Sequence, residues 1–226
     1  MRASGTGAAP RYPLIVFDWD GTLADSTQAI ALSIQAACVD MGCPAPTLDA
    51  ARHVIGLGLH EAMAYLVPGL SSGDYAQMIQ RYRAHWLPRD PQVALFPGSV
   101  ALLAQLAERG HMLAIATGKS SAGLQRALQA TAVADFFAAT RCADQCASKP
   151  APDMLQELMQ ELATSPEHTL MIGDTTHDLQ MARHAGVDGL AVCHGAHARD
   201  QLAALNPLAC LDDTAQLELW LREHAA

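Results

Sequence analysis

Short apolar runs recur along the chain and are separated by stretches in which apolar residues follow a helical spacing. Four of these runs carry no charge and are followed by polar residues: 14–17, 112–116, 169–172 and 189–192. A run of this length is typical of a strand that is buried on both faces, as in a parallel sheet.

Helical patterns lie between the predicted strands, at 99–109, 121–131, 154–162 and 179–185. Strands that alternate with helices in this way predict an α/β fold, a Rossmann-like parallel sheet with helices on both faces. Ligands of such sheets bind outside the carboxyl ends of the strands. The polar residues that follow the four runs are therefore the candidates for a site.

A segment early in the chain breaks the alternation. Residues 24–91 contain no convincing strand and show helical patterns at 26–41, 48–54, 59–66 and 72–86. We predict that this segment is a small α-helical cap domain inserted after the first strand. The sheet core then comprises residues 11–23 and 92–226, and the small and polar residues 1–10 are expected to be a disordered tail.

Composition narrows the choice of partners. Hydrophobic residues make up 50% of the 226 residues, and the net charge is -9. The first value allows a sizeable core, and the second argues against nucleic acid, which binds to a basic face. No apolar run is long enough to span a bilayer, and the six cysteines form no Cys-x-x-Cys pair. We expect reduced thiols in a cytoplasmic protein, either a monomer or a homodimer.

The first strand is followed by two acids, Asp18 and Asp20. Residues two apart in extended backbone point the same way, so both carboxylates can face one site, while Trp19 between them is expected to pack away from it. Two neighbouring acids repel each other unless a cation or a shared proton neutralises them, and Mg²⁺ with oxygen ligands is a natural solution. An ordinary polar turn at Asp20-Gly21 explains the pair equally well when it is taken alone.

The second strand is followed by Thr117, Gly118 and Lys119. A hydroxyl and a glycine amide that lead into a helix can hold anionic oxygens at the helix N-terminus. Lys119 is a candidate contact to substrate, and a solvent-facing role fits it about as well. Thr-Gly pairs are common, so this motif alone is weak.

Lysine is scarce in this chain. Only two of its 14 basic residues are lysines, Lys119 and Lys149. Lys149 lies in a loop before a helix, from which an ammonium can reach over the sheet to a carboxylate or a phosphate. A surface lysine is the alternative, which the scarcity of lysine weakens.

The third strand is followed by Asp174 and Asp178. These acids are four positions apart at the start of a helix, so they can share one face. Acidic residues at a helix N-terminus also stabilise the helix dipole. That structural role explains one of the two acids more easily than both.

Taken together, these motifs resemble those of the haloacid dehalogenase superfamily, over residues 14 to about 210. The matching segments are Asp18-Trp19-Asp20-Gly21-Thr22, Thr117-Gly118, Lys149-Pro150 and Gly173-Asp174-Thr175-Thr176-His177-Asp178. The helical insert is similar to the cap of the subgroup that includes phosphoglycolate phosphatases, β-phosphoglucomutases and a pyrophosphatase.

The resemblance implies a role for each matched residue. Asp18 would attack phosphorus and form an aspartyl phosphate, and Asp20 would first protonate the leaving oxygen and then activate water. Thr117 and Lys149 would hold phosphoryl oxygens. Mg²⁺ would be bound by Asp18, the Asp20 backbone carbonyl and Asp174, with Asp178 as a ligand or a supporting residue.

Candidate substrate-binding residues complete the predicted site: Gly21, Thr22, Gly118, Lys119 and, in the cap, Arg52. Arg52 could bind a substrate carboxylate or a second phosphate, and a surface position on a helix is an equal alternative. The histidines His194 and His197, beyond the fourth strand, are interpreted as loop residues.

The function indicated is a Mg²⁺-dependent phosphatase acting on a small phosphorylated metabolite, phosphoglycolate-like. A phosphomutase of the β-phosphoglucomutase type, a pyrophosphatase and a catalytically silent regulatory or binding protein on the same fold are the alternatives. The dehalogenase branch usually lacks the acid at Asp20. A phosphonatase would need a lysine in the cap, and residues 24–91 contain none.

Overall fold

The core of the protein is a six-stranded parallel sheet in the order β3-β2-β1-β4-β5-β6. A computed structural model describes residues 10–225, so the tail predicted for residues 1–10 lies outside the described residues except for Pro10. The strands are β1 (Leu14–Phe17), β2 (Met112–Thr117), β3 (Phe137–Cys142), β4 (Thr169–Gly173), β5 (Asp188–Val192) and β6 (Cys210–Leu211). The four strands predicted from apolar runs are confirmed, as is the α/β fold class.

Two strands, β3 and β6, were not predicted from the sequence. The first is an edge strand with the sequence Phe-Ala-Ala-Thr-Arg-Cys, in which only Ala139 and Cys142 are buried and which contains Arg141. The second has only two residues. Neither has the continuous apolar run that marks a strand with neighbours on both sides, because edge strands are only half covered.

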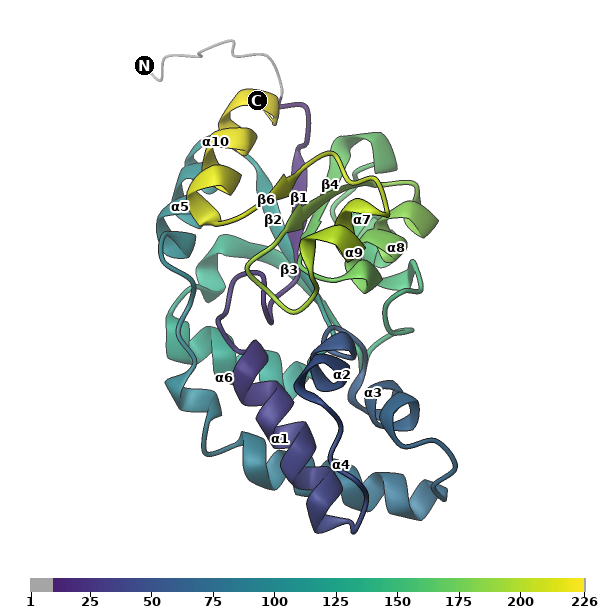
Figure 1. Ribbon diagram of the computed structural model, residues 1–226. Helices are drawn as coiled ribbons and strands as arrows, with labels where there is room; N and C mark the ends of the chain where they lie inside the picture. The colour runs from purple at the N-terminus through teal and green to yellow at the C-terminus, as the bar shows by residue number, and fades with distance from the viewer. Residues whose placement is uncertain (1–9, 226) are drawn as a thin grey trace, which may run out of the picture.

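The alternation of side chains along β1 explains why this strand is wholly apolar. Ile15 and Phe17 belong to one core cluster, together with residues of α5 (Ser99–Glu108) and α10 (Thr214–His224). Leu14 and Val16 point to the opposite face and pack with residues of α7 (Asp153–Glu161) and α8 (Thr176–Ala185). Both faces of the sheet are thus covered by helices, as Figure 1 shows.

Four helices form a separate lobe below the sheet in Figure 1: α1 (Thr27–Asp40), α2 (Leu48–His53), α3 (Leu59–Leu66) and α4 (Ser72–Trp86). They share a hydrophobic cluster of their own that includes Ile34, Met63 and Met78. We call this lobe the cap. The helices predicted in this segment are confirmed.

Two chain segments join the cap to the core, and they run side by side. Ala24 pairs with Leu95 in an antiparallel bridge, and the Phe96 amide donates to the Leu23 carbonyl at 2.9 Å. This pairing brings the chain back beside the point where it left the core.

The remaining α-helices of the described residues are α6 (Ser121–Thr131), after β2, and α9 (Arg199–Ala203), before β6. No helix within residues 10–225 has the length and apolar character needed to cross a membrane.

Candidate active site

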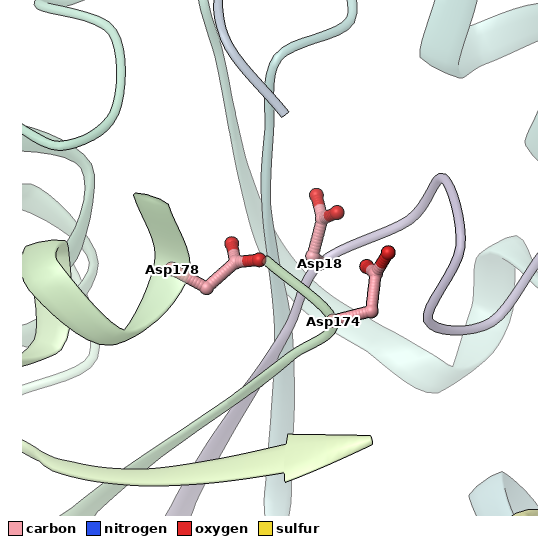
Figure 2. Close-up of side chains that lie close together, drawn as sticks. All are labelled: Asp18, Asp174 and Asp178. Carbon is pink, nitrogen blue, oxygen red and sulfur yellow. The ribbon is translucent and has the colours of Figure 1, made fainter. Parts of the chain in front are cut away.

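Three carboxylates converge at the carboxyl ends of neighbouring strands (Figure 2). Asp18 follows β1 and Asp174 follows β4, which are paired in the sheet, and Asp178 lies in the first turn of α8. One oxygen of each carboxylate lies within 4.8 Å of the others, and all three residues have no exposed surface. The sheet topology therefore brings together the acids that follow the first and third predicted strands.

Lys149 places its ammonium inside this acidic cluster. Its Nζ lies 2.6 Å from Asp18 Oδ1 and 2.7 Å from Asp178 Oδ1, and the side chain has no exposed surface. Lysine is almost never buried without partners, so this position depends on the two carboxylates. The ammonium of this lysine, which lies in the loop before α7, thus reaches over the sheet to carboxylates, one of the two partners that the sequence indicated.

Burial and mutual repulsion perturb the titration of this cluster. Burial, aided by the charges of Asp178 and Asp20, raises the pKa of Asp18 to about 7 despite the attraction of Lys149. Burial and the charges of Asp18 and Asp178 likewise raise the pKa of Asp174 well above its usual range. Burial disfavours the charge of Lys149, but the attraction of Asp178 and Asp18 outweighs it and raises the lysine pKa. The single ammonium of Lys149 therefore does not balance the negative charge of the three acids.

The donor set fits a hard divalent cation. When all three acids are ionised, Lys149 leaves two negative charges unbalanced. Asp18 Oδ2 is buried and has no hydrogen-bond partner among residues 10–225. A buried carboxylate oxygen without a donor is expensive, whereas an oxygen-liganded Mg²⁺ would satisfy it and balance the charge.

Asp174 and Asp178 differ in how their oxygens are engaged. Each oxygen of Asp174 accepts one bond, from Thr22 Oγ1 and from the Ala196 amide, both at 2.7 Å. Those single bonds orient the carboxylate and leave lone pairs for a cation. Asp178 Oδ2 accepts from both the amide and the hydroxyl of Thr175, at 3.0 and 2.7 Å, while Oδ1 faces Lys149. Asp178 is thus also part of the capping box that begins α8.

Asp20 lies beside this cluster and is held by other groups. Lys119 Nζ donates to both of its carboxylate oxygens, at 2.8 and 2.9 Å, and the Ser26 hydroxyl donates to Oδ1 at 2.7 Å. Ser26 is the N-cap residue of α1, but its side chain makes no capping bond to the helix. The hydroxyl that a helix start would normally use is directed to Asp20 instead.

Gly21 and Gly118, the two glycines predicted to bind substrate, lie at positions where a Cβ atom would collide with neighbouring residues. Gly21 has a φ of +88°, and a Cβ at this position would meet the Asp174 carboxylate. A Cβ on Gly118 would meet the backbone carbonyls of Gly56 and Leu57 in the cap. Gly21 therefore allows the turn after β1 to pass Asp174, and Gly118 allows the cap to approach the end of β2.

The other predicted residues are spread over the surroundings of the site. Thr117 is fully buried, and its Oγ1 accepts from the Lys119 amide at 3.2 Å. The hydrogen bond of Arg52 stays within the cap, from Nη2 to Gln28 at 2.7 Å. The Nε of Arg52 is buried and has no partner among the described residues. Trp19 is 1% exposed and packs in the main core cluster, as alternation predicted.

Several residues that hold the cap against the core were not predicted as such. The Ser148 hydroxyl accepts from the Gly58 amide at 2.6 Å. His177 Nε2 and His197 Nε2 both lie within hydrogen-bond distance of the His53 carbonyl at the end of α2, at 2.8 and 3.0 Å. Burial lowers the pKa of both imidazoles, that of His197 to about 4, so each is neutral and donates one N–H. His197 lies in a loop, as interpreted, but it is buried beneath the cap.

A family model described as haloacid dehalogenase-like hydrolase matches residues 15–192. The chain is 35% identical to the probable phosphatase IndB of Dickeya dadantii (strain 3937), over 91% of each chain. It is 34% identical to the tyrosine-protein kinase PtkA of Mycobacterium tuberculosis (strain ATCC 25618 / H37Rv), over 86% of this chain and 66% of that protein. It is 31% identical to a phosphoglycolate phosphatase of Rhodospirillum rubrum, over 92% of this chain and 90% of that protein.

Among solved structures, a putative haloacid dehalogenase-like hydrolase from Bacteroides fragilis superimposes with a TM-score of 0.84 at 26% identity. The match covers 91% of this chain and 99% of that one, so cap and core are both included. These similarities confirm the family that the motifs indicated. The chain belongs to the haloacid dehalogenase-like hydrolases, in the subgroup similar to phosphoglycolate phosphatase, and is a hydrolase of phosphoric monoesters.

Proposed function

We propose that the protein is a Mg²⁺-dependent phosphatase of a small, phosphoglycolate-like metabolite and that Asp18 forms an aspartyl phosphate. The observation that carries the proposal is the unpartnered Asp18 Oδ2, buried in an acidic cluster while Oδ1 is held by Lys149 at 2.6 Å. A carboxylate that is held at one oxygen in this way is oriented for attack. Its buried surroundings strengthen every electrostatic contact to a phosphoryl group.

Each residue of the site then has one task. An Asp18 oxygen attacks phosphorus, the bond to the leaving oxygen breaks, and Asp20 supplies the proton that this oxygen takes up. Lys149 and the Thr117 hydroxyl bind the equatorial phosphoryl oxygens. Asp18, Asp174 and the Asp20 carbonyl would hold Mg²⁺, and Asp178 would orient Lys149. When bound, the ion supplies neutralisation of phosphoryl charge.

The cap would select the substrate. Its loop at Gly56 and Leu57 reaches Gly118, so the space above the site is shared between cap and core. Arg52 carries a buried Nε that lacks a partner among the described residues, which suits a second anionic group on a small substrate. The carboxylate of a phosphoglycolate-like compound is such a group. Six free cysteines agree with a reducing, cytoplasmic setting.

The proposal is tested with purified protein, a panel of phosphorylated metabolites and Mg²⁺. We expect release of inorganic phosphate, loss of this activity in Asp18→Asn, and covalent phosphate on the wild-type protein after quenching. Undiminished hydrolysis by Asp18→Asn would overturn it. Sugar-phosphate isomers formed without phosphate release would indicate a mutase, and hydrolysis of pyrophosphate alone a pyrophosphatase. Absence of any turnover would favour a silent binding protein.

A further inference from the structure

Lys119 lies between the core and the cap rather than in the acidic cluster. Its Nζ bonds both oxygens of Asp20 and also lies 4.8 Å from the ring centroid of Trp86, the last residue of α4. We propose that Lys119 is a positioning residue, which fixes the orientation of the Asp20 carboxylate, and that Trp86 keeps Lys119 in place. The inference rests on the proposed function, in which Asp20 transfers protons.

All side-chain hydrogen bonds at the Asp20 carboxylate are donated to it by other groups. Its oxygens accept two bonds from Lys119 and one from Ser26, and they donate none. Three bonds donated to one carboxylate fix its orientation and the direction of its remaining lone pairs. Charge-assisted bonds of this length also fix the plane of the carboxylate, because two donors on a single ammonium span both oxygens.

Lys119 is itself anchored at its backbone. Its amide donates to Thr117 Oγ1 at 3.2 Å, and its carbonyl accepts from the Ala143 amide at 3.1 Å. These bonds tie the root of the side chain to the ends of β2 and β3. The ammonium therefore reaches Asp20 from a fixed base, and it is not available to the phosphoryl group while this pair is intact.

The cap closes the other side of this ion pair. The side chain of Lys119 is 9% exposed, and Trp86 stacks with Tyr82 of the same helix at a centroid distance of 6.4 Å. The cavity bordered by Lys119, Trp19 and Trp86 has a volume of about 10 Å³, at the limit for one water molecule. A cation over an aromatic face, shielded from water, is attracted to the ring, so the cap contributes to the position of Lys119.

This arrangement serves the second half of the reaction. Water attacks the phosphorus of the aspartyl phosphate, the bond from phosphorus to Asp18 breaks, and the proton of that water passes to Asp20. In the first half, Asp20 must instead give a proton to the leaving oxygen. p-Nitrophenyl phosphate removes that need, because p-nitrophenolate leaves without a proton. Loss of Lys119 should therefore slow phosphoenzyme hydrolysis while this substrate still phosphorylates Asp18.

The test is rapid-mixing kinetics of Lys119→Met with p-nitrophenyl phosphate and Mg²⁺. We expect a burst of p-nitrophenolate that approaches one per protein chain, followed by a steady-state kcat reduced on the order of 10-fold. Lys119→Arg keeps a cationic donor and should recover most of kcat. A raised KM with unchanged kcat in Lys119→Met would overturn the inference, because it would mean direct binding of substrate phosphate.

A double-mutant cycle provides the second measurement. If Lys119 acts through Asp20, Lys119→Met should change the rate of Asp20→Asn by less than about 2-fold. If the rate losses of Lys119→Met and Asp20→Asn multiply in the double variant while the phosphoenzyme still forms, the role of Lys119 is overturned but the proposed function is not. A wild-type protein that never carries covalent phosphate would instead overturn the proposed function.

Trp86 offers a probe that leaves the ion pair chemically intact. Trp86→Leu removes the aromatic face, and Trp86→Phe keeps it as the matched control. We expect the burst pattern of Lys119→Met in weaker form for Trp86→Leu and near wild-type kinetics for Trp86→Phe. Thermal unfolding of every variant separates these effects from loss of the fold, and identical kinetics for both Trp86 variants would overturn the role of the ring.

Discussion

Lys149 Nζ lies 2.6 Å from Asp18 Oδ1, although 131 positions separate the two residues in the chain. The contact is fully buried and also includes Asp178, so one ammonium from the loop before α7 joins the end of β1 to the start of α8. Together with the Lys119–Asp20 pair, it assigns each of the two lysines of this chain to one acid of the Asp18-Trp19-Asp20 segment.

Removal of this ammonium should destabilise the protein as well as inactivate it. Lys149→Met leaves Asp18 and Asp178 facing each other without a cation in a site that water does not reach. We expect a loss of about 3–5 kcal/mol in the free energy of unfolding of the metal-free protein. Denaturant unfolding measures it, with Lys119→Met as the comparison. The Lys119 and Asp20 side chains are 9% and 11% exposed, against 0% and 1% for Lys149 and Asp18, so the loss for Lys119→Met should be smaller. A loss for Lys149→Met no larger than for Lys119→Met would contradict this prediction.

Stability should depend on pH and on Mg²⁺ together. The pKa of Asp18 is raised to about 7 in the folded protein. Between about pH 4 and 7 the Asp18 carboxyl is therefore ionised in the unfolded chain but still protonated in the folded protein. Folded stability without metal must then fall as the pH rises through this window. Mg²⁺ relieves the repulsion, so it should raise Tm more at about pH 8 than at about pH 5.

The variant Asp18→Asn checks the same reasoning with a readout other than activity. It removes one buried charge, so its metal-free Tm at about pH 8 should exceed that of the wild type, and its Mg²⁺ increment should shrink. Calorimetry with chelator and with Mg²⁺ measures both quantities. If Mg²⁺ raises the Tm of the wild type equally at about pH 5 and at about pH 8, the buried acids are not the cause of the pH dependence of stability.

Thr22 should govern metal affinity. Its hydroxyl donates to Asp174 Oδ1 at 2.7 Å and both residues are buried, so the sequence-based assignment to substrate binding competes with a role in orienting a metal ligand. We expect Thr22→Val, which keeps the shape, to weaken Mg²⁺ binding by roughly 10- to 100-fold. The dependence of Tm on Mg²⁺ concentration measures it. The control is Thr131→Val, since among residues 10–225 the Thr131 hydroxyl bonds only carbonyls of its own helix. Unchanged Mg²⁺ affinity in Thr22→Val would favour the substrate role.

The strands of the sheet could be predicted to different extents, for a physical reason. Strand β1 has neighbours on both sides and helices on both faces, so all four of its positions must be apolar. Strand β3 has one free edge and partly exposed positions, and its composition therefore resembles that of a loop. The carboxyl ends of parallel strands meet at one edge, which is why the sequence alone predicts that Asp18 and Asp174 lie together.

The partners of the polar side chains could not be predicted in the same way. Ser26 stands where a helix cap is expected, and its hydroxyl bonds Asp20 instead. Lys119 follows a predicted anion-binding turn, yet its ammonium pairs with Asp20. These contacts depend on the path of the turn after β1 and on the position of the cap, neither of which has a signature in apolar spacing.

Gly21 makes that turn possible, and its replacement should separate backbone strain from steric collision. With a φ of +88°, any residue with a Cβ is strained here by about 1–2 kcal/mol, and the Cβ would also strike the Asp174 carboxylate. Gly110 has a φ of +89°, but a Cβ there would meet nothing within 4 Å, so Gly110→Ala carries the strain without the collision. We expect Gly21→Ala to lose more unfolding free energy than Gly110→Ala and to lose Mg²⁺-induced stabilisation, which Gly110→Ala keeps. Because the displaced group is the carboxylate proposed to bind the metal, equal losses in the two variants, with Mg²⁺ stabilisation intact in both, would mean that Asp174 can move aside and that the turn does not fix the site.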